Sequence, residues 1–439
     1  MLETIKSAWK IPELRKKLLY TLLIIVIFRI GSVIPAPFLD TSVVSEWMGA
    51  NASDGNFLNY LDTLTGGALS KATIFSLSIT PFINASIIIQ LLTYALPPLE
   101  RLSKEGTEGR KVLNKISAYV AFALAIVMSL AYYLTMKSAG AVKYKSGFEG
   151  VFCMIAIMLV FITGAMLVVW LGNRVNEKGI GNGISIILFA GIIARLPVDV
   201  VDMVTLAKNE PNPYVFIVPL ILLIYVAMIT FIVFMNDSER RIPIQYAKRV
   251  VGRKQYGGQN THIPVKVCMS GVMPIIFAMA FMSLPSTIGM FFPVAENPET
   301  FGQKFYAGFL NFFNYRSPWY AILYFILIIA FNYFYVAMQY NPVEIANNLR
   351  QSNGGIPGIR PGKPTADYIQ RVLSKITIVG AFFLGIIAIF PIFFSMAVPD
   401  LSGLAMGGTS ILIIVNVALE TVRTLESQMM MRNHKGFLE

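Results

Sequence analysis

The feature that most constrains this sequence is a series of ten apolar stretches, each long enough to cross a lipid bilayer as a helix. A helix needs about 20 mostly apolar residues to span the hydrocarbon core. Soluble domains carry about a quarter charged residues, whereas this chain carries 14%. We therefore predict an all-α polytopic membrane protein with ten transmembrane helices. They are expected near residues 18–36, 76–96, 116–136, 150–171, 183–204, 213–235, 267–292, 318–340, 376–396 and 409–427.

The positions of the 36 lysines and arginines predict how these helices are oriented. Cytoplasmic loops of membrane proteins carry an excess of basic residues. Both termini are therefore predicted to be cytoplasmic, and topology explains much of the net charge of +12 without nucleic acid. Most of the basic residues fall in the two terminal segments and in the loops 97–115, 172–182, 236–266 and 341–375, all on one side of the membrane.

Two of the predicted spans are interrupted by proline. The second span contains Pro81, and the seventh contains Pro274 and Pro285. If residues 1–204 and 205–439 are two sets of five helices, the interrupted span is the second of each set. Matched interruptions are typical of membrane proteins whose functional site lies between two repeats, so we predict a site between these spans. Proline is also commoner in membrane helices than in soluble ones, which leaves an ordinary structural role open.

The segment before the second span, at about residues 57–70, is amphipathic but too short and too polar to cross a membrane. A glycine pair, Gly66 and Gly67, follows its apolar positions and is a typical helix end. We predict a short helix that dips back into the membrane from the outer side.

Residues that catalysis or ion coupling would need are scarce in the predicted spans. We assign Arg29, Arg195 and Glu420 to them, all toward helix ends, where the arginines are expected to reach the interface. The sequence contains no zinc-protease, serine-hydrolase or phosphate-binding motif. Its two histidines cannot build a metal site inside the membrane. We predict a protein that is not an enzyme and uses no cofactor.

Five motifs, in order along nearly the whole chain, resemble the bacterial SecY family. They lie at residues 81–92, 179–186, 240–249, 341–342 with 357–362, and 407–410. The resemblance implies the central subunit of a protein-conducting channel in the bacterial plasma membrane, with two pseudo-symmetric five-helix halves around a central pore. Such a channel passively translocates unfolded polypeptides and releases signal or transmembrane segments into lipid through a lateral gate between the second and seventh spans.

The resemblance also implies roles for individual residues inside the membrane. In the family the short helix near 57–70 is a plug, which here includes Leu61, Leu64, Gly66 and Gly67. Polar residues expected at the lateral gate are Asn84, Gln90 and Thr287, although ordinary interhelical hydrogen bonds would explain them equally well. A ring of aliphatic side chains would resist ion conduction by excluding water, and its expected members are Ile79, Ile83, Ile184, Leu188, Ile276 and Ile413.

The basic loops 236–266 and 341–375 resemble the family's cytosolic docking loops. Phosphate-rich RNA and acidic motor surfaces both favour such a patch, while topology alone accounts for part of its charge. The implied partners are the small membrane subunits SecE and SecG, the SecA motor ATPase, the ribosome, signal-bearing polypeptides and the lipid bilayer. The predicted docking residues are Arg240, Arg241, Lys248, Arg249, Arg253, Lys254 and Arg360.

The residues by themselves leave two other functions open. A secondary transporter of small solutes would explain the interrupted helices, but it would need ionisable coupling residues inside the spans. A scaffold that docks ribosomes without conducting would share the basic loops, but it would not explain the convergent aliphatic residues.

Overall fold

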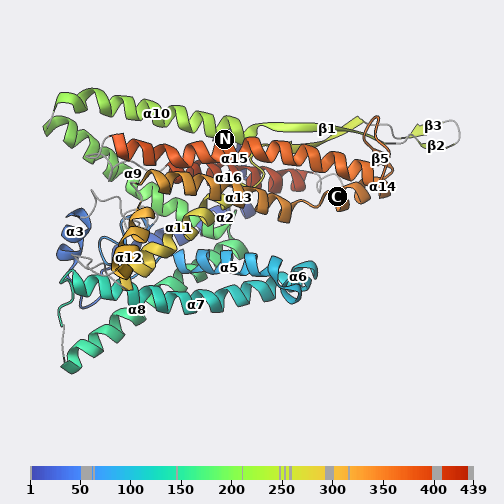
Figure 1. Ribbon diagram of the computed structural model, residues 1–439. Helices are drawn as coiled ribbons and strands as arrows, with labels where there is room; N and C mark the ends of the chain where they lie inside the picture. The colour runs from blue at the N-terminus through green and yellow to red at the C-terminus, as the bar shows by residue number, and fades with distance from the viewer. Residues whose placement is uncertain are drawn as a thin grey trace. The chain divides into compact units, whose positions relative to one another are not determined.

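Each of the ten predicted spans contains one helix of the computed structural model (Figure 1). The structure describes residues 2–50, 62, 65–144, 147–209, 211–246, 249–251, 254–256, 260–291, 301–314, 317–397 and 408–433. The helices are α1 (Leu2–Lys10), α2 (Pro12–Gly31), α3 (Thr41–Ala50), α5 (Thr80–Ala95), α6 (Pro97–Lys104), α7 (Thr107–Ser138), α8 (Gly147–Lys178), α9 (Gly183–Asn209), α10 (Pro211–Asp237), α11 (Met273–Phe291), α12 (Phe301–Phe312), α13 (Pro318–Gln339), α14 (Pro342–Gln351), α15 (Lys363–Ala397) and α16 (Gly408–Asn433). The strands are β1 (Glu239–Tyr246), β2 (Arg249–Val251), β3 (Lys254–Tyr256), β4 (Asn260–Lys266) and β5 (Gly354–Gly355).

Several of these helices meet the length and composition needed to cross a bilayer. Within the described ranges, α7, α8, α9, α10, α13 and α15 do so singly, and α5 with α6 do so as a pair bent by 102°. The predicted fold class, an all-α polytopic membrane protein, is confirmed. The count of ten spans stays a prediction, although each predicted span contains one helix.

The structure corrects the boundaries of both proline-interrupted spans. The second span was predicted from residue 76, but α5 begins at Thr80 with Pro81 in its first turn. The seventh was predicted from residue 267, but α11 begins at Met273, directly before Pro274. Proline is favoured in a first turn because its missing N–H would have no helical partner there. Of the three prolines, only Pro285 interrupts a helix from within.

Contacts along the chain group the molecule into two compact units. Unit 1 comprises Met1–Leu220, Ala280–Tyr320 and Pro391–Glu439, and unit 2 comprises Ile221–Met279 and Ala321–Phe390. The predicted division at residues 204 and 205 partitions the chain differently and stays a prediction.

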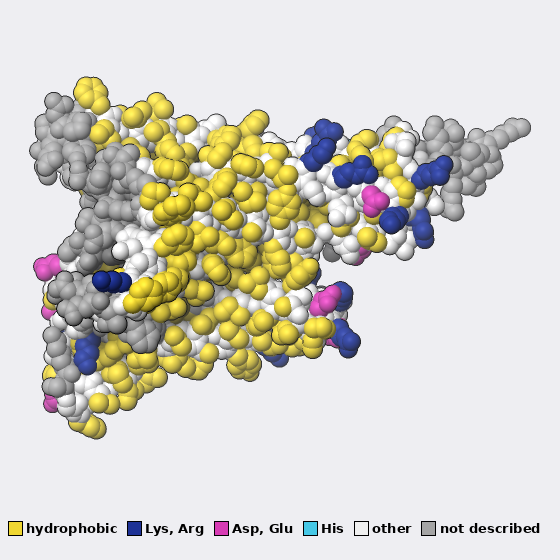
Figure 2. All heavy atoms as spheres, in the orientation of Figure 1, with side chains coloured by type: hydrophobic (Ala, Val, Ile, Leu, Met, Phe, Trp, Pro, Cys, Tyr) yellow, Lys and Arg dark blue, Asp and Glu magenta, His cyan; other side chains and the backbone are white. Residues whose placement is uncertain are grey.

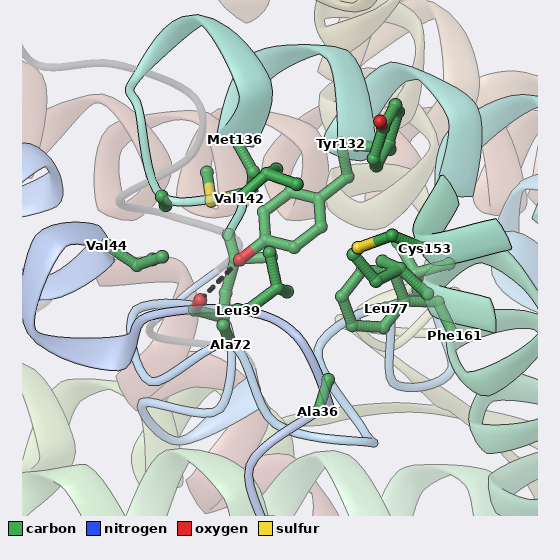
Figure 3. Close-up of a cluster of buried hydrophobic side chains, with 14 of the residues drawn as sticks. Ala36, Leu39, Val44, Ala72, Leu77, Tyr132, Met136, Val142, Cys153 and Phe161 are labelled. Atoms are coloured by element: carbon green, nitrogen blue, oxygen red, sulfur yellow. Dashed lines mark hydrogen bonds between the residues drawn. The ribbon is translucent and has the colours of Figure 1, made fainter. Parts of the chain in front are cut away.

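A buried hydrophobic cluster in unit 1 surrounds Tyr132 of α7 (Figure 3). Its ring packs edge-on against Phe161 of α8, with 5.1 Å between ring centroids. Its hydroxyl donates a hydrogen bond of 2.7 Å to the carbonyl oxygen of Leu69, which satisfies a buried polar group. The non-helical segment 66–79 is thereby tied to α7 at a defined place.

Segment 66–79 also pairs with the chain that follows α2. The Ala36 N–H donates to the Ala72 carbonyl at 2.8 Å, and the Ile74 N–H donates to the Ile34 carbonyl at 3.0 Å. These bonds satisfy backbone groups that have no helix to partner them. They also show that residues 32–36, predicted as the end of the first span, are not helical.

Unit 2 contains a small antiparallel sheet that the sequence analysis had treated as a loop. The strand order is β4-β1-β5, with Ile242 opposite Ile263 and Gln245 opposite Gly355. Pro243 lies where β1 has β4 as its neighbour but not β5, so its missing N–H costs less there than in a strand paired on both sides. The strands do not alter the fold class, because they form a local addition to a helical protein.

The close contact of α8 with segment 66–79 gives a stability prediction. A Cβ atom on Gly164 would overlap the carbonyl oxygen of Ile74. We expect Gly164→Ala to lower the free energy of unfolding by about 1–3 kcal/mol, because backbone must move to admit the methyl group. The thermal midpoint of the purified protein in detergent measures this loss.

Gly308 in α12 is the matched control, because a Cβ atom there would meet no atom of the described chain within 4 Å. Gly308→Ala should leave the midpoint unchanged or raise it slightly, as alanine favours helix over glycine by up to about 1 kcal/mol. Equal midpoints for the two variants would contradict the close packing of α8.

Candidate functional site

The first four predicted pore-ring residues lie in two pairs, each one helical turn apart. Ile79 is the N-cap of α5, and the Ile83 N–H donates to its carbonyl at 3.1 Å. Ile184 and Leu188 lie in the first two turns of α9. Ile79 and Leu188 are buried, and Ile83 and Ile184 are half-buried. Each pair thus presents adjacent aliphatic side chains on one face of its helix.

The remaining two ring residues also occupy helix starts. Ile413 is buried in the first two turns of α16, in unit 1. Ile276 is half-buried in the first turn of α11, in unit 2. All six residues therefore lie at the beginning of a helix, where they offer water no hydrogen-bonding group. Their convergence in one ring stays a prediction.

The three polar residues predicted at the lateral gate are half-buried on α5 and α11. Asn84 and Gln90 lie on α5, nearly two turns apart. Thr287 donates its hydroxyl hydrogen to the carbonyl oxygen of Ser283 in its own helix, at 2.9 Å. Thr287 could therefore serve another helix only as an acceptor.

Within the predicted plug the structure describes Asp62, which is helical, and the residues from Thr65 onward, while Leu61 and Leu64 lie outside the described residues. Gly66 and Gly67 have φ angles of +70° and +82°, a conformation that favours glycine. A Cβ atom on Gly66 would also lie 2.5 Å from the carbonyl oxygen of Gly191 in α9. Glycine at position 66 thus lets the segment pack directly on α9.

The structure corrects the interpretation of Arg195 as a residue that reaches the membrane interface. Its guanidinium instead forms ion pairs with Asp62 and with Asp199, one turn further along α9. The sequence analysis overlooked Asp199 and Asp202 among the ionisable residues of the fifth span. The spacing of four residues between Arg195 and Asp199 is typical of a helical ion pair and could have revealed the second partner.

The predicted docking residues that the structure describes belong to unit 2. Arg240 and Arg241 are exposed on β1, and Arg241 forms an ion pair of 2.7 Å with Glu239. Arg249 and Lys254 belong to the paired strands β2 and β3. Lys248 and Arg253 lie outside the described part of the chain.

Arg360 is held on a turn between β5 and α15. Thr365 donates its hydroxyl hydrogen to the Arg360 carbonyl at 2.9 Å. Gly358 and Gly362 flank the turn with φ angles of +79° and +101°, which side chains rarely adopt. The Arg360 side chain is exposed. A shaped backbone, rather than a free loop, therefore presents this charge.

An apolar core supports this surface, which we call the basic platform and define as β1, β4, β5, α14 and the turn 356–362. Ile242 and Ile244, on one face of β1, are buried against side chains of β4, α14, residue 356 and the start of α15. An open groove of about 570 Å³ lies beside the sheet and is lined by Gln245, Tyr246, Arg350, Asn353–Gly358 and Pro361. Figure 2 shows lysine and arginine side chains gathered around β1, β5 and α14.

Arg350 is a residue of the platform that the sequence analysis did not propose for docking. It lines the groove and is exposed in the last turn of α14. Asn341 begins this helix by accepting hydrogen bonds from the N–H groups of Val343 and Glu344. The pair Asn341-Pro342 is a typical helix start. Because Arg350 follows within the length of a short helix, the sequence could have placed it near the end of α14.

Long apolar helices, aliphatic helix starts and an exposed basic platform together define a multi-pass membrane protein with an exposed basic surface. A family model described as SecY matches residues 73–422. The protein translocase subunit SecY of Streptomyces griseus is 40% identical over 448 residues, covering 100% of both chains. Its counterpart in Mycobacterium bovis is 38% identical over 449 residues with the same coverage. The chain belongs to the SecY family.

Solved structures agree with this fold. A protein-conducting channel covers 96% of this chain and 96% of its own, with a TM-score of 0.61 and 18% identity. A SecY structure concerned with the plug domain gives 0.57 at 18% identity, with the same coverage. Sec61 in a canine ribosome-channel complex also gives 0.57, at 17% identity and 96% coverage of each chain.

The burial of β1 predicts that the basic platform depends on its apolar core. Ile244 is 3% exposed, so Ile244→Ala should destabilise the platform by about 2–5 kcal/mol through the cavity it leaves. We expect faster trypsin cleavage within residues 239–266. Gln245→Ala, an exposed change in the same strand, should leave the cleavage rate as in the native protein; equal rates for the two variants would contradict the supporting role of the core.

Proposed function

We propose that this chain is the central subunit of a passive channel that moves unfolded polypeptides across the bacterial plasma membrane. The observation that carries the proposal is full-length identity of 40% to a protein translocase subunit. In the same channel, signal or transmembrane segments leave laterally into lipid. The chain is inferred to have both termini in the cytoplasm, as its basic loops suggest.

The six aliphatic residues would form the narrow part of the path. Branched aliphatic side chains offer ions and water no hydrogen bonds, so a narrow ring of them resists conduction by dewetting. The same side chains can move aside for a polypeptide without recognising its sequence. Ile79, Ile83, Ile184, Leu188 and Ile413 lie at helix starts in unit 1, and Ile276 lies at a helix start in unit 2.

The lateral gate would lie between α5 and α11. A signal segment is apolar and about as long as one membrane span, so an opening into lipid sorts it by hydrophobicity while polar chain continues through the pore. Hydrogen bonds between membrane helices are worth about 0.6–2 kcal/mol. Asn84 and Gln90, with Thr287 as acceptor, would therefore hold the gate weakly enough for a signal segment to open it.

The short helix predicted near residues 57–70 would plug the outer side of the pore. In a related SecY structure, the plug domain stabilises the closed state of the translocation channel and maintains a membrane seal. Here Leu69 and Gly66 of that segment contact Tyr132 of α7 and Gly191 of α9, and Ile74, just after it, lies against Gly164 of α8. Such packing is what a seal against ions requires.

The free energy that drives polypeptide translocation would come from partner proteins and not from catalysis by this chain. We infer that a SecA motor and the ribosome dock on the basic platform through Arg240, Arg241 and Arg360. The adjoining residues 248–254 would add the charges of Lys248, Arg249, Arg253 and Lys254. A related channel has been solved in a ribosome-channel complex. Basic patches suit both acidic protein surfaces and ribosomal RNA. SecE and SecG are the expected membrane partners.

The channel is tested by making its narrow part polar. Ile83→Ser and Ile276→Ser should each raise the ion leak of reconstituted vesicles, because a hydroxyl gives water a hydrogen-bonding partner in the constriction. Ile88→Ser is the control, since Ile88 is 39% exposed on the same helix as Ile83. Unchanged leak in both test variants would favour a scaffold that docks ribosomes without conducting.

Docking is tested by reversing one charge. Arg360→Glu should abolish motor-driven transport of a signal-bearing polypeptide into vesicles, because a partner selected by positive charge is then repelled. The amount of channel in the membrane should stay at the native level. Lys137→Glu, an exposed change at the end of α7, is expected to transport normally. Normal transport by Arg360→Glu would rule out its docking role.

A further inference from the structure

The described start of the plug segment carries a buried carboxylate that the proposed pore ring, gate and platform do not use. The Asp62 side chain is 3% exposed. Its Oδ1 accepts a hydrogen bond of 2.7 Å from the Ser70 N–H, and its Oδ2 accepts one from Arg195 Nη1 in α9. A carboxylate removed from water needs such partners. Asp62 keeps both of them while the segment lies on α9.

Arg195 has a second carboxylate within reach on its own helix. Its Nε lies 3.4 Å from Asp199 Oδ1, and the Asp199 side chain is 4% exposed. Two buried carboxylates therefore face one guanidinium, whose side chain is 25% exposed. Asp199 moves with Arg195 because both belong to α9, whereas Asp62 belongs to the plug segment.

The ion pair lies beside a closely fitted contact. Gly66 approaches the Gly191 carbonyl of α9 so closely that it has no room for a side chain. On α7, the Tyr132 hydroxyl donates a hydrogen bond to the Leu69 carbonyl oxygen. Packing and neutral hydrogen bonds thus position the plug segment. The ion pair between Asp62 and Arg195 adds a charged contact to α9, and this contact is lost when the segment moves away.

We propose that Asp62 and Arg195 form an electrostatic clasp that holds the plug segment in its closed position, and that Asp199 makes the clasp reversible. When Asp62 departs, Arg195 stays paired with Asp199 and leaves no unpaired cation in the wall of the channel. Opening is therefore less costly than breaking an isolated buried ion pair. The proposal rests on the proposed function of the plug segment, and Arg195 and Asp199 act as positioning residues.

The clasp is tested by anion flux from vesicles that contain the resting channel complex, without motor or substrate. Asp62→Asn keeps an acceptor for the Ser70 N–H but removes the ion pair, and Arg195→Gln removes the cation. Each should raise the leak about tenfold, which corresponds to about 1.4 kcal/mol in the balance between closed and open states. Lys71→Gln, an exposed change in the same segment, should not raise it.

The double variant distinguishes a direct pair from two separate structural effects. Asp62→Asn with Arg195→Gln should leak no more than either single variant, because the shared interaction is already absent. If the double variant raises the leak by the product of the two single effects, the two residues act independently and the clasp is overturned. Native leak in both single variants overturns it as well.

Asp199→Asn gives an effect in the opposite direction. Arg195 then depends on Asp62 alone, so the closed state should be favoured and the rate of motor-driven translocation should fall while resting leak stays native. A raised leak in Asp199→Asn would contradict the role of Asp199. If Arg195→Gln does not assemble, Arg195→Lys replaces it and is expected to leak less than Asp62→Asn; equal leak counts against the clasp.

Ile83→Ser in the same assay distinguishes this proposal from the channel function itself. If Ile83→Ser leaks and the clasp variants do not, the clasp is wrong and the channel stands. If neither Ile83→Ser nor the clasp variants leak, the proposed function fails and the clasp fails with it.

Discussion

Inside a bilayer, every backbone N–H and C=O must find its partner within the protein, and the described structure of unit 1 depends on this requirement. Helices satisfy it automatically, but the segment 66–79 is not helical. Its backbone is paired with residues 34–36. Two of its own hydroxyls add to the pairing, since Thr73 donates to the Ala68 carbonyl and Ser76 to the Thr73 carbonyl. An irregular segment can therefore be buried among membrane helices, because most of its backbone groups are paired within the protein.

The two kinds of surface in this protein suit two different tasks. Aliphatic residues at helix starts suit a path that must be tight to ions and indifferent to sequence. The basic platform of unit 2 suits reversible binding of large charged partners, and its apolar core around Ile242 and Ile244 fixes the direction of the exposed arginines. In the proposed function, partners bound to the basic platform supply the driving force, and the membrane helices supply selectivity and the seal.

Sequence reasoning predicted the helices well because their cause is local. A run of about 20 apolar residues can satisfy itself in lipid only as a helix, so each of the ten stretches contains one. The errors fall at helix ends, where Pro81 and Pro274 start helices instead of interrupting them. The strand β1 was also missed, although apolar residues alternate at 242, 244 and 246. The positive charge around them directed attention to topology instead.

The sequence by itself determined the class of protein, the membrane helices, the family and the basic character of the loops. These properties follow from composition and from short-range periodicity. Only the tertiary structure decided that Arg195 faces Asp62 across 133 residues, and that Gly66 lies against Gly191. This ion pair depends on how the chain around Asp62 packs onto α9, and no local sequence pattern predicts that contact. The physical reason is that burial, which makes such a pair strong, is a property of the folded molecule and not of either residue.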